Sequence, residues 1–267
     1  MDLGLTGKGC VVTGASRGIG REVARRLCAE GAQVLLVARG EAELRDAASE
    51  CGRLGAPVNG RAAALACDVT DADAAERIAS DAEDRFGAID VLVNNAGTAS
   101  WRTVDETSAD DWRAAYELNV IACLGLLRAL TPPMRDRGWG RVVNVSSSAA
   151  KRPSATLPEY SAAKAAQLSL SRLFAERCAP DGVLVNAICP GPVASELWMD
   201  EGGLLDQARG DTSRDQALQD VGASRPIGRV ASVGEIASAI VYLCSDQASY
   251  VAGAAWSVDG GSVPGIL

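Results

Sequence analysis

Short apolar segments recur along this chain of 267 residues, and longer amphipathic stretches separate them. The apolar segments are rich in Val, Ile, Leu and Ala with little alternation, which is typical of strands buried on both faces of a parallel sheet. Repeated alternation of strand and helix predicts right-handed crossovers and a doubly wound α/β sheet of about seven parallel strands with helices on both faces. The expected strands are Cys10–Thr13, Gln33–Ala38, Ala63–Cys67, Val91–Asn94, Arg141–Ser146, Leu184–Cys189 and Ala255–Val258.

Helical spacing is found between these strands. Val23, Ala24 and Leu27 form an apolar stripe that Gly31 is suited to end. Residues 1–267 are expected to form one domain with an insertion at 194–229, which is polar, rich in glycine and long enough for an active-site lid or a surface excursion. The expected helices are Gly20–Gly31, Thr70–Phe86, Ser108–Arg137, Tyr160–Ala179 and Val233–Cys244.

Charge and composition exclude several classes of protein. The formal net charge of −8 argues against nucleic acid or an anionic membrane as the main partner, although a locally basic phosphate pocket is still possible. The chain has no histidine, so His-based acid–base catalysis and His-ligated zinc are excluded, and no metal site is expected. Eight scattered cysteines without a CxxC pair predict free, buried thiols in a reducing, cytoplasmic protein.

A glycine-rich turn follows the first strand and opens the first helix. Residues 13–20 read TGASRGIG, and Gly14, Gly18 and Gly20 suit a tight turn, close approach of the backbone to a diphosphate, and close packing of helix on strand. Free N–H groups at the helix start then hold the phosphates. The sequence therefore predicts a dinucleotide site, and Ser16, Arg17 and Ile19 within the turn are expected to contact the cofactor.

A second motif can supply a proton without histidine. Tyr160 and Lys164 lie four residues apart and share one face of a helix. A tyrosine with a free pKa near 10 needs a nearby ammonium to stabilise its phenolate, so we expect Lys164 to lower the pKa of Tyr160. Three serines, Ser146, Ser147 and Ser148, precede this pair and are candidates for a hydroxyl beside the tyrosine.

Taken together, these motifs resemble the short-chain dehydrogenase/reductase family, in order and spacing, from about Lys8 to Gly261. The resemblance implies a Rossmann-type fold and a nicotinamide cofactor, with Asn119 holding a water in a proton relay through Lys164. It also implies that Ser147, thirteen residues before Tyr160, is the first choice for the serine beside the tyrosine, with Ser146 the second and Ser148 expected only to cap or pack. The residues that carry it are TGASRGIG at 13–20, NNAG at 94–97, Asn119, Ser146–Ser148, YSAAK at 160–164 and Pro190–Gly191.

The resemblance also implies a set of cofactor contacts. Asp68 and Val69 would contact the adenine, although a lone aspartate here can equally be a turn residue. Ser195 stands where the family often has Thr, and its hydroxyl could still hold the carboxamide. The remaining implied contacts are Asn95, Ala96 and Gly97 beside the ribose, Tyr160 and Lys164, and Pro190, Gly191 and Val193 at the nicotinamide end.

The end of the second strand favours NADP(H) over NAD(H). Ala38 stands where NAD enzymes place an acid for the ribose hydroxyls, and Arg39 follows it. Arg17 adds a second cation, and a guanidinium suits a phosphate. Glu41 is close enough in sequence to compete for the ribose.

The substrate is the open question. The preferred hypothesis is a general carbonyl reductase or secondary-alcohol dehydrogenase acting on a small molecule. The alternative is a 3-oxoacyl-[acyl-carrier-protein] reductase, and a non-catalytic nucleotide-binding regulator is less favoured. A carrier protein needs a basic patch, to which Arg135, Arg137 and Arg141 could contribute, but Asp181 and the acidic net charge disfavour it. An apolar substrate wall, or packing of the insertion, is expected from Leu197, Trp198, Met199, Leu204 and Leu205.

Assembly is also predicted. Helices 108–137 and 160–179 carry more apolar positions than one face on a sheet requires, and residues 251–267 are apolar and rich in glycine. We therefore expect a homotetramer, or at least a dimer.

Overall fold

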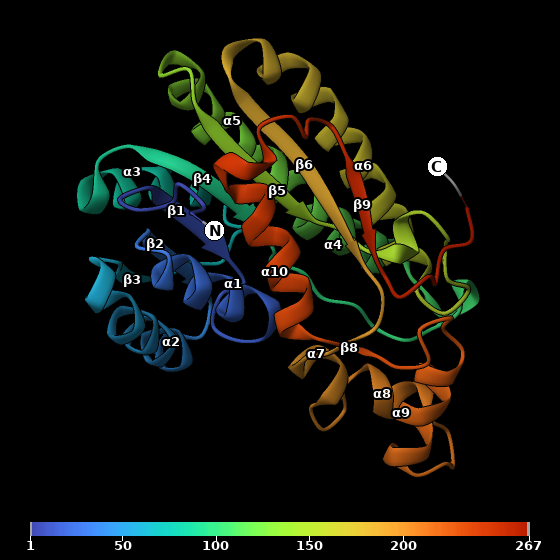
Figure 1. The fold of residues 1–267 in the computed structure, drawn as a ribbon. Helices are drawn as coiled ribbons and strands as arrows, with labels where there is room; N and C mark the ends of the chain where they lie inside the picture. Colours follow the sequence, from blue (N-terminus) through green and yellow to red (C-terminus); the bar gives the residue numbers. More distant parts are fainter. Residues whose placement is uncertain (1, 266–267) are drawn as a thin grey trace.

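A single parallel sheet of seven strands forms the centre of the molecule (Figure 1). The structure is a computed structural model and describes residues 2–265, so the first residue of the expected domain and the last two of the apolar C-terminal segment lie outside it. The strand order is β3-β2-β1-β4-β5-β6-β9, which confirms the predicted doubly wound fold. The strands are β1 (Gly9–Thr13), β2 (Gln33–Ala38), β3 (Arg61–Ala66), β4 (Ile89–Asn94), β5 (Gly140–Val145), β6 (Val183–Pro190) and β9 (Ala255–Val258), while β7 (Val193–Ala194) pairs separately with β8 (Ala231–Ser232).

Helices cover both faces of this sheet, and each face has its own apolar core. One layer consists of α1 (Gly18–Ala29), α2 (Glu41–Gly55) and α10 (Val233–Cys244). The other consists of α3 (Ala74–Phe86), α4 (Ala109–Tyr116), α5 (Ala122–Asp136) and α6 (Pro158–Cys178). Short 3₁₀ turns lie at Ala56–Val58 (η1), Val104–Glu106 (η2), Ser148–Ala150 (η4), Ala179–Asp181 (η5) and Asp246–Ala248 (η6).

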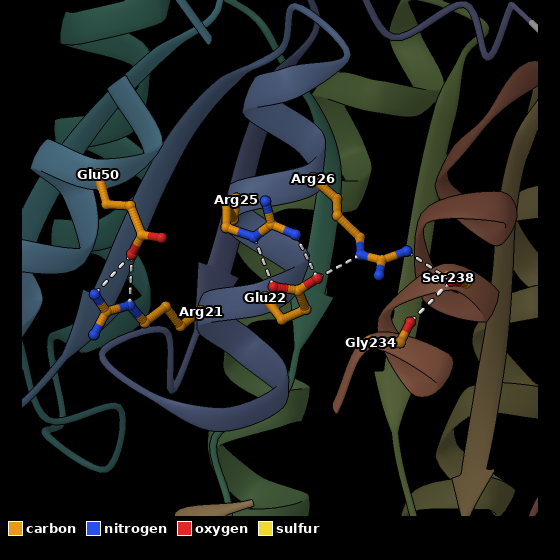
Figure 2. Close-up of polar contacts among 7 residues, drawn as sticks. All are labelled: Arg21, Glu22, Arg25, Arg26, Glu50, Gly234 and Ser238. Atoms are coloured by element: carbon orange, nitrogen blue, oxygen red, sulfur yellow. Dashed lines mark hydrogen bonds and ion pairs between the residues drawn. The ribbon is translucent and has the colours of Figure 1, made fainter. Parts of the chain in front are cut away.

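Polar contacts join the three helices of the first layer (Figure 2). Arg21 of α1 pairs with Glu50 of α2, with 2.7 Å between Nη2 and Oε2. On the other side of α1, the guanidinium of Arg26 contacts Glu22 and also donates to the hydroxyl of Ser238 on α10. These pairs are partly exposed and contribute little each, but they orient α1, whose first turn borders the site described below.

One expectation about single elements is wrong, and one helix was not predicted. Burial on both faces holds for the central strands but not for β3 and β9, which lie at the two edges of the sheet and are only half-buried. Helix α2 was not among the expected helices, and its apolar stripe consists of Leu44 and small residues, Ala47, Ala48 and Cys51.

The expected helix at 108–137 contains an irregular turn. Residues Glu117–Ile121 (η3) form a π-helical turn between α4 and α5. The stretch Ala109–Asp136 has the length and hydropathy of a membrane span, although such a helix is equally found in protein cores. Here Leu126, Leu127 and Leu130 belong to the core beneath α3 and α6, so the stretch is a core helix of the fold.

All eight cysteines are free and buried, as expected from their apolar surroundings. Seven of them belong to the two apolar cores, where a thiol packs as a small hydrophobe, and Cys189 is buried in β6.

The segment 194–229 contains three short helices, α7 (Glu196–Met199), α8 (Leu204–Ala208) and α9 (Arg214–Ala223). They are grouped in the lower part of Figure 1, beyond the end of the sheet at which β6 finishes. Leu204 is buried against Ala99 and Leu157, and Leu197, Trp198 and Tyr160 pack around this small cluster. The segment therefore rests on the body of the protein next to Tyr160.

Candidate functional site

A cleft of about 1310 Å³ lies along the carboxyl ends of the strands. The point between β1 and β4 is where a ligand is expected in such a sheet, because these neighbouring strands continue into helices on opposite faces. Of the residues expected to form the site, all line the cleft except Gly20 and Asn119. These lining residues are Gly14, Ser16, Arg17, Gly18, Ile19, Arg39, Asp68, Val69, Asn95, Ala96, Gly97, Ser147, Tyr160, Lys164, Pro190, Gly191, Val193 and Ser195.

The glycine loop leaves room for a ligand above α1. Gly14 and Gly18 have φ values of +63° and +58°, which residues with side chains rarely adopt. Gly20 lies beneath the loop, where a Cβ atom would come within 2.4 Å of the Gly14 carbonyl oxygen. No acidic residue occupies the first turn of α1, so its free N–H groups could hold a diphosphate.

The NNAG segment is tied directly to this loop. The side-chain amide of Asn95 donates to the carbonyl oxygens of Thr13 (2.9 Å) and Gly14 (3.1 Å). In return, the hydroxyl of Thr13 accepts from the backbone N–H groups of Asn95 and Ala96, both at 3.0 Å. These four hydrogen bonds fix the ends of β1 and β4 against each other.

Arg39 lies in the cleft with a side chain that is 81% exposed. Its Nη1 is 3.8 Å from Oδ2 of Asp68, whose Oδ1 accepts from the backbone and hydroxyl of Thr70. These Thr70 hydrogen bonds are the main reason why the pKa of Asp68 lies below its usual value. Asp68 therefore closes a turn and also faces the cleft.

Besides Asp68, the acid of this region that lines the cleft is Glu43 rather than Glu41. Glu41 pairs with Arg45 along α2, whereas Glu43 lines the cleft. The other cation of this region, Arg17, pairs with Asp200 at 2.8 Å, which joins the glycine loop to the segment 194–229.

Two of the three candidate serines have different partners. Ser147 lies against the phenol of Tyr160, and its hydroxyl also accepts from the N–H of Ala149 at 3.1 Å. Ser146 is buried and donates its hydroxyl to the carbonyl of Lys164 at 3.1 Å, which ties β5 to α6. Ser147 is therefore the serine placed to act on a ligand together with Tyr160.

Lys164 is 2% exposed, and protein groups bind its ammonium. Its Nζ donates to the carbonyl of Val145 (2.7 Å) and to Oε1 of Gln167 (3.3 Å). Burial lowers the pKa of Lys164 to about 8, against the smaller opposing effects of the Cys123 and Cys189 thiols.

The expected lowering of the tyrosine pKa is wrong for this structure. Burial raises the pKa of Tyr160 to about 12, and only the contact with Ser147 opposes it. Nζ of Lys164 lies 5.7 Å from the centre of the Tyr160 ring, with its hydrogen bonds directed to Val145 and Gln167. At neutral pH the phenol is therefore a proton donor.

Asn119 lies behind the cleft in the π-helical turn η3. Its amide donates to the carbonyl of Ala115 (2.9 Å), while its Oδ1 is buried without a hydrogen-bond partner. A Cβ atom built on Gly97 would lie 3.4 Å from this oxygen and 3.6 Å from Nζ of Lys164. The absence of a side chain at Gly97 thus leaves space between Asn119 and Lys164.

The turn after β6 closes the cleft opposite the glycine loop. Gly191 packs so closely on the backbone of Asp259 that a Cβ atom would lie 2.9 Å from its carbonyl oxygen. Among the apolar residues of the insertion, Leu197, Trp198 and Leu204 line the cleft, whereas Met199 and Leu205 do not.

Four residues of this site were missed in the sequence. Glu43 lies on a helix that was not predicted, and Gln167 lies one turn after Lys164, where helical spacing alone could have indicated it. Arg152 and Arg225 also line the cleft, and no local pattern connects them.

Comparison with known proteins gives consistent matches along the whole chain. A family model described as enoyl-(acyl carrier protein) reductase matches residues 14–262. The short-chain reductase protein NovJ of Streptomyces niveus is 37% identical over 94% of this chain and 92% of its own. The 3-oxoacyl-[acyl-carrier-protein] reductase FabG of Salmonella typhimurium is 33% identical over 96% and 97%. A solved structure of L-sorbose reductase from Gluconobacter frateurii, complexed with NADPH and L-sorbose, is 36% identical, covers both chains fully and has a TM-score of 0.92. The chain belongs to the short-chain dehydrogenase/reductase family.

Proposed function

We propose that this protein is an NADP(H)-dependent oxidoreductase that interconverts a carbonyl compound and a secondary alcohol by hydride transfer. The observation that carries the proposal is the grouping of Ser147, Tyr160 and Lys164 in one cleft with the glycine loop. The similarity to a reductase solved with NADPH supports the cofactor. Nicotinamide supplies the hydride, and the residues of this chain supply binding, orientation and the proton.

Each catalytic residue has a role that follows from its surroundings. Tyr160 gives its proton to the carbonyl oxygen during reduction and takes it back during oxidation. Ser147 donates to the same oxygen, so that charge developing there is stabilised. Lys164 stabilises the phenolate left behind and holds a cofactor hydroxyl, and Asn119 completes a relay of protons behind it.

The cofactor residues divide along the cleft. Gly14, Ser16, Gly18, Ile19 and Gly20 shape the diphosphate site, and Arg17 and Arg39 bind the 2′-phosphate. Asp68, Val69 and the NNAG segment border the adenine and its ribose, while Pro190, Gly191, Val193 and Ser195 border the nicotinamide. The segment 194–229 acts as the lid on the substrate side.

Reduction of an acyl chain on a carrier protein remains the alternative, because FabG is among the relatives. The basic patch that such a partner needs is weak here. Arg135 is paired with Asp181 at 2.6 Å, and Arg137 contacts Asp90 and a backbone carbonyl. We therefore favour a small-molecule substrate, and a cytoplasmic location is supported by the eight free thiols.

Replacing Tyr160 with Phe should reduce turnover at least about 10²-fold, because the ring stays and the proton donor is lost. NADPH affinity should barely change. Lys164→Ala should lower both turnover and NADPH affinity, since the ammonium serves the phenol and the cofactor. Steady-state rates on a panel of ketones and NADPH titration test this, with the exposed Tyr250→Phe as control. Retention of more than about a tenth of wild-type turnover by Tyr160→Phe would exclude it as the acid.

The rate of ketone reduction should fall as the pH rises above about 8, because Lys164 then loses its charge. Tyr160, with a pKa of about 12, stays protonated over the same range. Gln167→Glu places a carboxylate beside Nζ, raises the pKa of Lys164 and should move the alkaline limb to higher pH by about one unit. Gln247→Glu adds the same charge on the surface and should leave the profile unchanged. If the alkaline limb of the pH–rate profile were identical in Gln167→Glu and the wild type, the assignment of this limb to Lys164 would be wrong.

NADPH should bind at least about tenfold more tightly than NADH, since each charged hydrogen bond to the 2′-phosphate is worth about 1.5–3 kcal/mol. Arg39→Gln should remove more of this preference than Arg17→Gln, because Arg17 must first leave Asp200. Fluorescence titration with both cofactors measures the ratio. Arg53→Gln, on the same helix layer but outside the cleft, is the control. Equal affinities in the unmutated protein would refute the preference.

We also propose that four copies of this chain form a homotetramer. Two separate surfaces expose large apolar side chains, Ile121 and Leu173 on the helix layer, and Tyr250 and Trp256 near β9. Two different two-fold contacts generate a closed tetramer. Light scattering should give the mass of four chains, and Leu173→Glu should reduce it to two, whereas Leu54→Glu on α2 should not. A monomer mass at micromolar concentration would rule out this assembly.

A further inference from the structure

Two arginines from distant parts of the chain line the same cleft as Tyr160. Arg152 lies in the loop that leads to α6, and Arg225 follows α9 in the segment 194–229. We call them the arginine pair.

Neither arginine forms an ion pair with any residue in 2–265. Nη1 of Arg152 donates to the backbone carbonyl of Ser262 at 3.3 Å, and Nη1 of Arg225 donates to the hydroxyl of Ser224. Nε of Arg225 is buried and has no partner among the described atoms. A guanidinium has five N–H donors, so most of the donors on both side chains are available to a ligand.

An acid close to Arg225, Asp259, is already hydrogen-bonded to the backbone. Asp259 is buried, and its two carboxylate oxygens accept from the N–H groups of Gly261 (3.0 Å) and Val263 (2.9 Å). Burial, and after it the neighbouring Arg152, lower the pKa of Arg225, while Asp259 opposes them. Two arginines that lie close enough to repel one another thus line the cleft, and no residue in 2–265 forms an ion pair with either of them.

We propose that the arginine pair binds an anionic group of the substrate, so that the carbonyl compound reduced at Tyr160 is an acid. The ligand class is a ketone that carries a carboxylate or a phosphate at a distance from the carbonyl. Paired guanidinium groups recognise either anion through parallel hydrogen bonds. Leu197 and Trp198 line the wall of the cleft and suit the hydrocarbon part. This inference rests on the proposed function and adds its substrate class.

The test compares methyl-ketone carboxylic acids of increasing chain length with the primary amide of each acid. The wild-type enzyme should show a KM at least about tenfold lower for the preferred acid than for its amide. A parallel comparison of a keto phosphate ester with the parent hydroxyketone shows which anion gains more. A gain with either anion supports the proposal.

Variants then assign the effect to the arginine pair. Arg152→Gln and Arg225→Gln should each raise the KM of the acid about tenfold or more and leave kcat and the KM of the amide nearly unchanged. Arg225→Lys should retain part of the preference, because a point charge remains. Arg229→Gln is the matched control, since Arg229 is exposed, pairs with Glu235 and lies outside the cleft.

Binding is also followed without turnover, as the rise in Tm that each acid or amide produces in the presence of NADP⁺. Failure of every ketone to react would count against the proposed function, while the Tm shifts still test the arginine pair. Equal KM and equal Tm shifts for acid and amide in the wild-type protein would overturn the inference. So would an equal loss of acid and amide binding in both glutamine variants.

Discussion

The whole site depends on the place in the sheet where β1 and β4 lie side by side but continue to opposite faces. Such a divergence opens a crevice at the carboxyl ends of the strands. The segments that form its walls lie beyond the strand ends, so the hydrogen bonds of the sheet do not fix them. The hydrogen bonds between Thr13 and Asn95 do this, because they join the two strand ends below the glycine loop. The loop can then adopt positive φ values at Gly14 and Gly18 without losing its position relative to Gly97 and Lys164.

The chemistry depends on burial as much as on the identity of the residues. Burial acts in opposite directions on the two titrating groups, raising the pKa of Tyr160 and lowering that of Lys164. The phenol is thereby kept protonated, while the ammonium is held by Val145 and Gln167 until a ligand offers it a new partner. A protonated phenol is the state that the proposed reduction requires, and in the proposed mechanism a bound cofactor would bring the ammonium towards the reacting groups.

Much of this arrangement follows from local pattern in the sequence. Apolar runs located every strand of the main sheet to within two residues, because buried parallel strands have few polar positions. Helix α2 was not predicted because small residues such as Ala47 and Ala48 give a weak apolar stripe. The direction of the Lys164 side chain and the meeting of Arg152 with Arg225 depend on tertiary packing, which residue spacing does not contain.

The buried cysteines have a consequence for how the molecule can be observed. All eight thiols are buried, and burial raises the pKa of those at positions 10, 123 and 244, so the reactive thiolate is rare at these three positions in the folded state. Alkylating reagents then reach these sulfurs only when a core opens. Because both faces of the sheet contain cysteines, the order in which they become labelled would distinguish local opening of one helix layer from global unfolding.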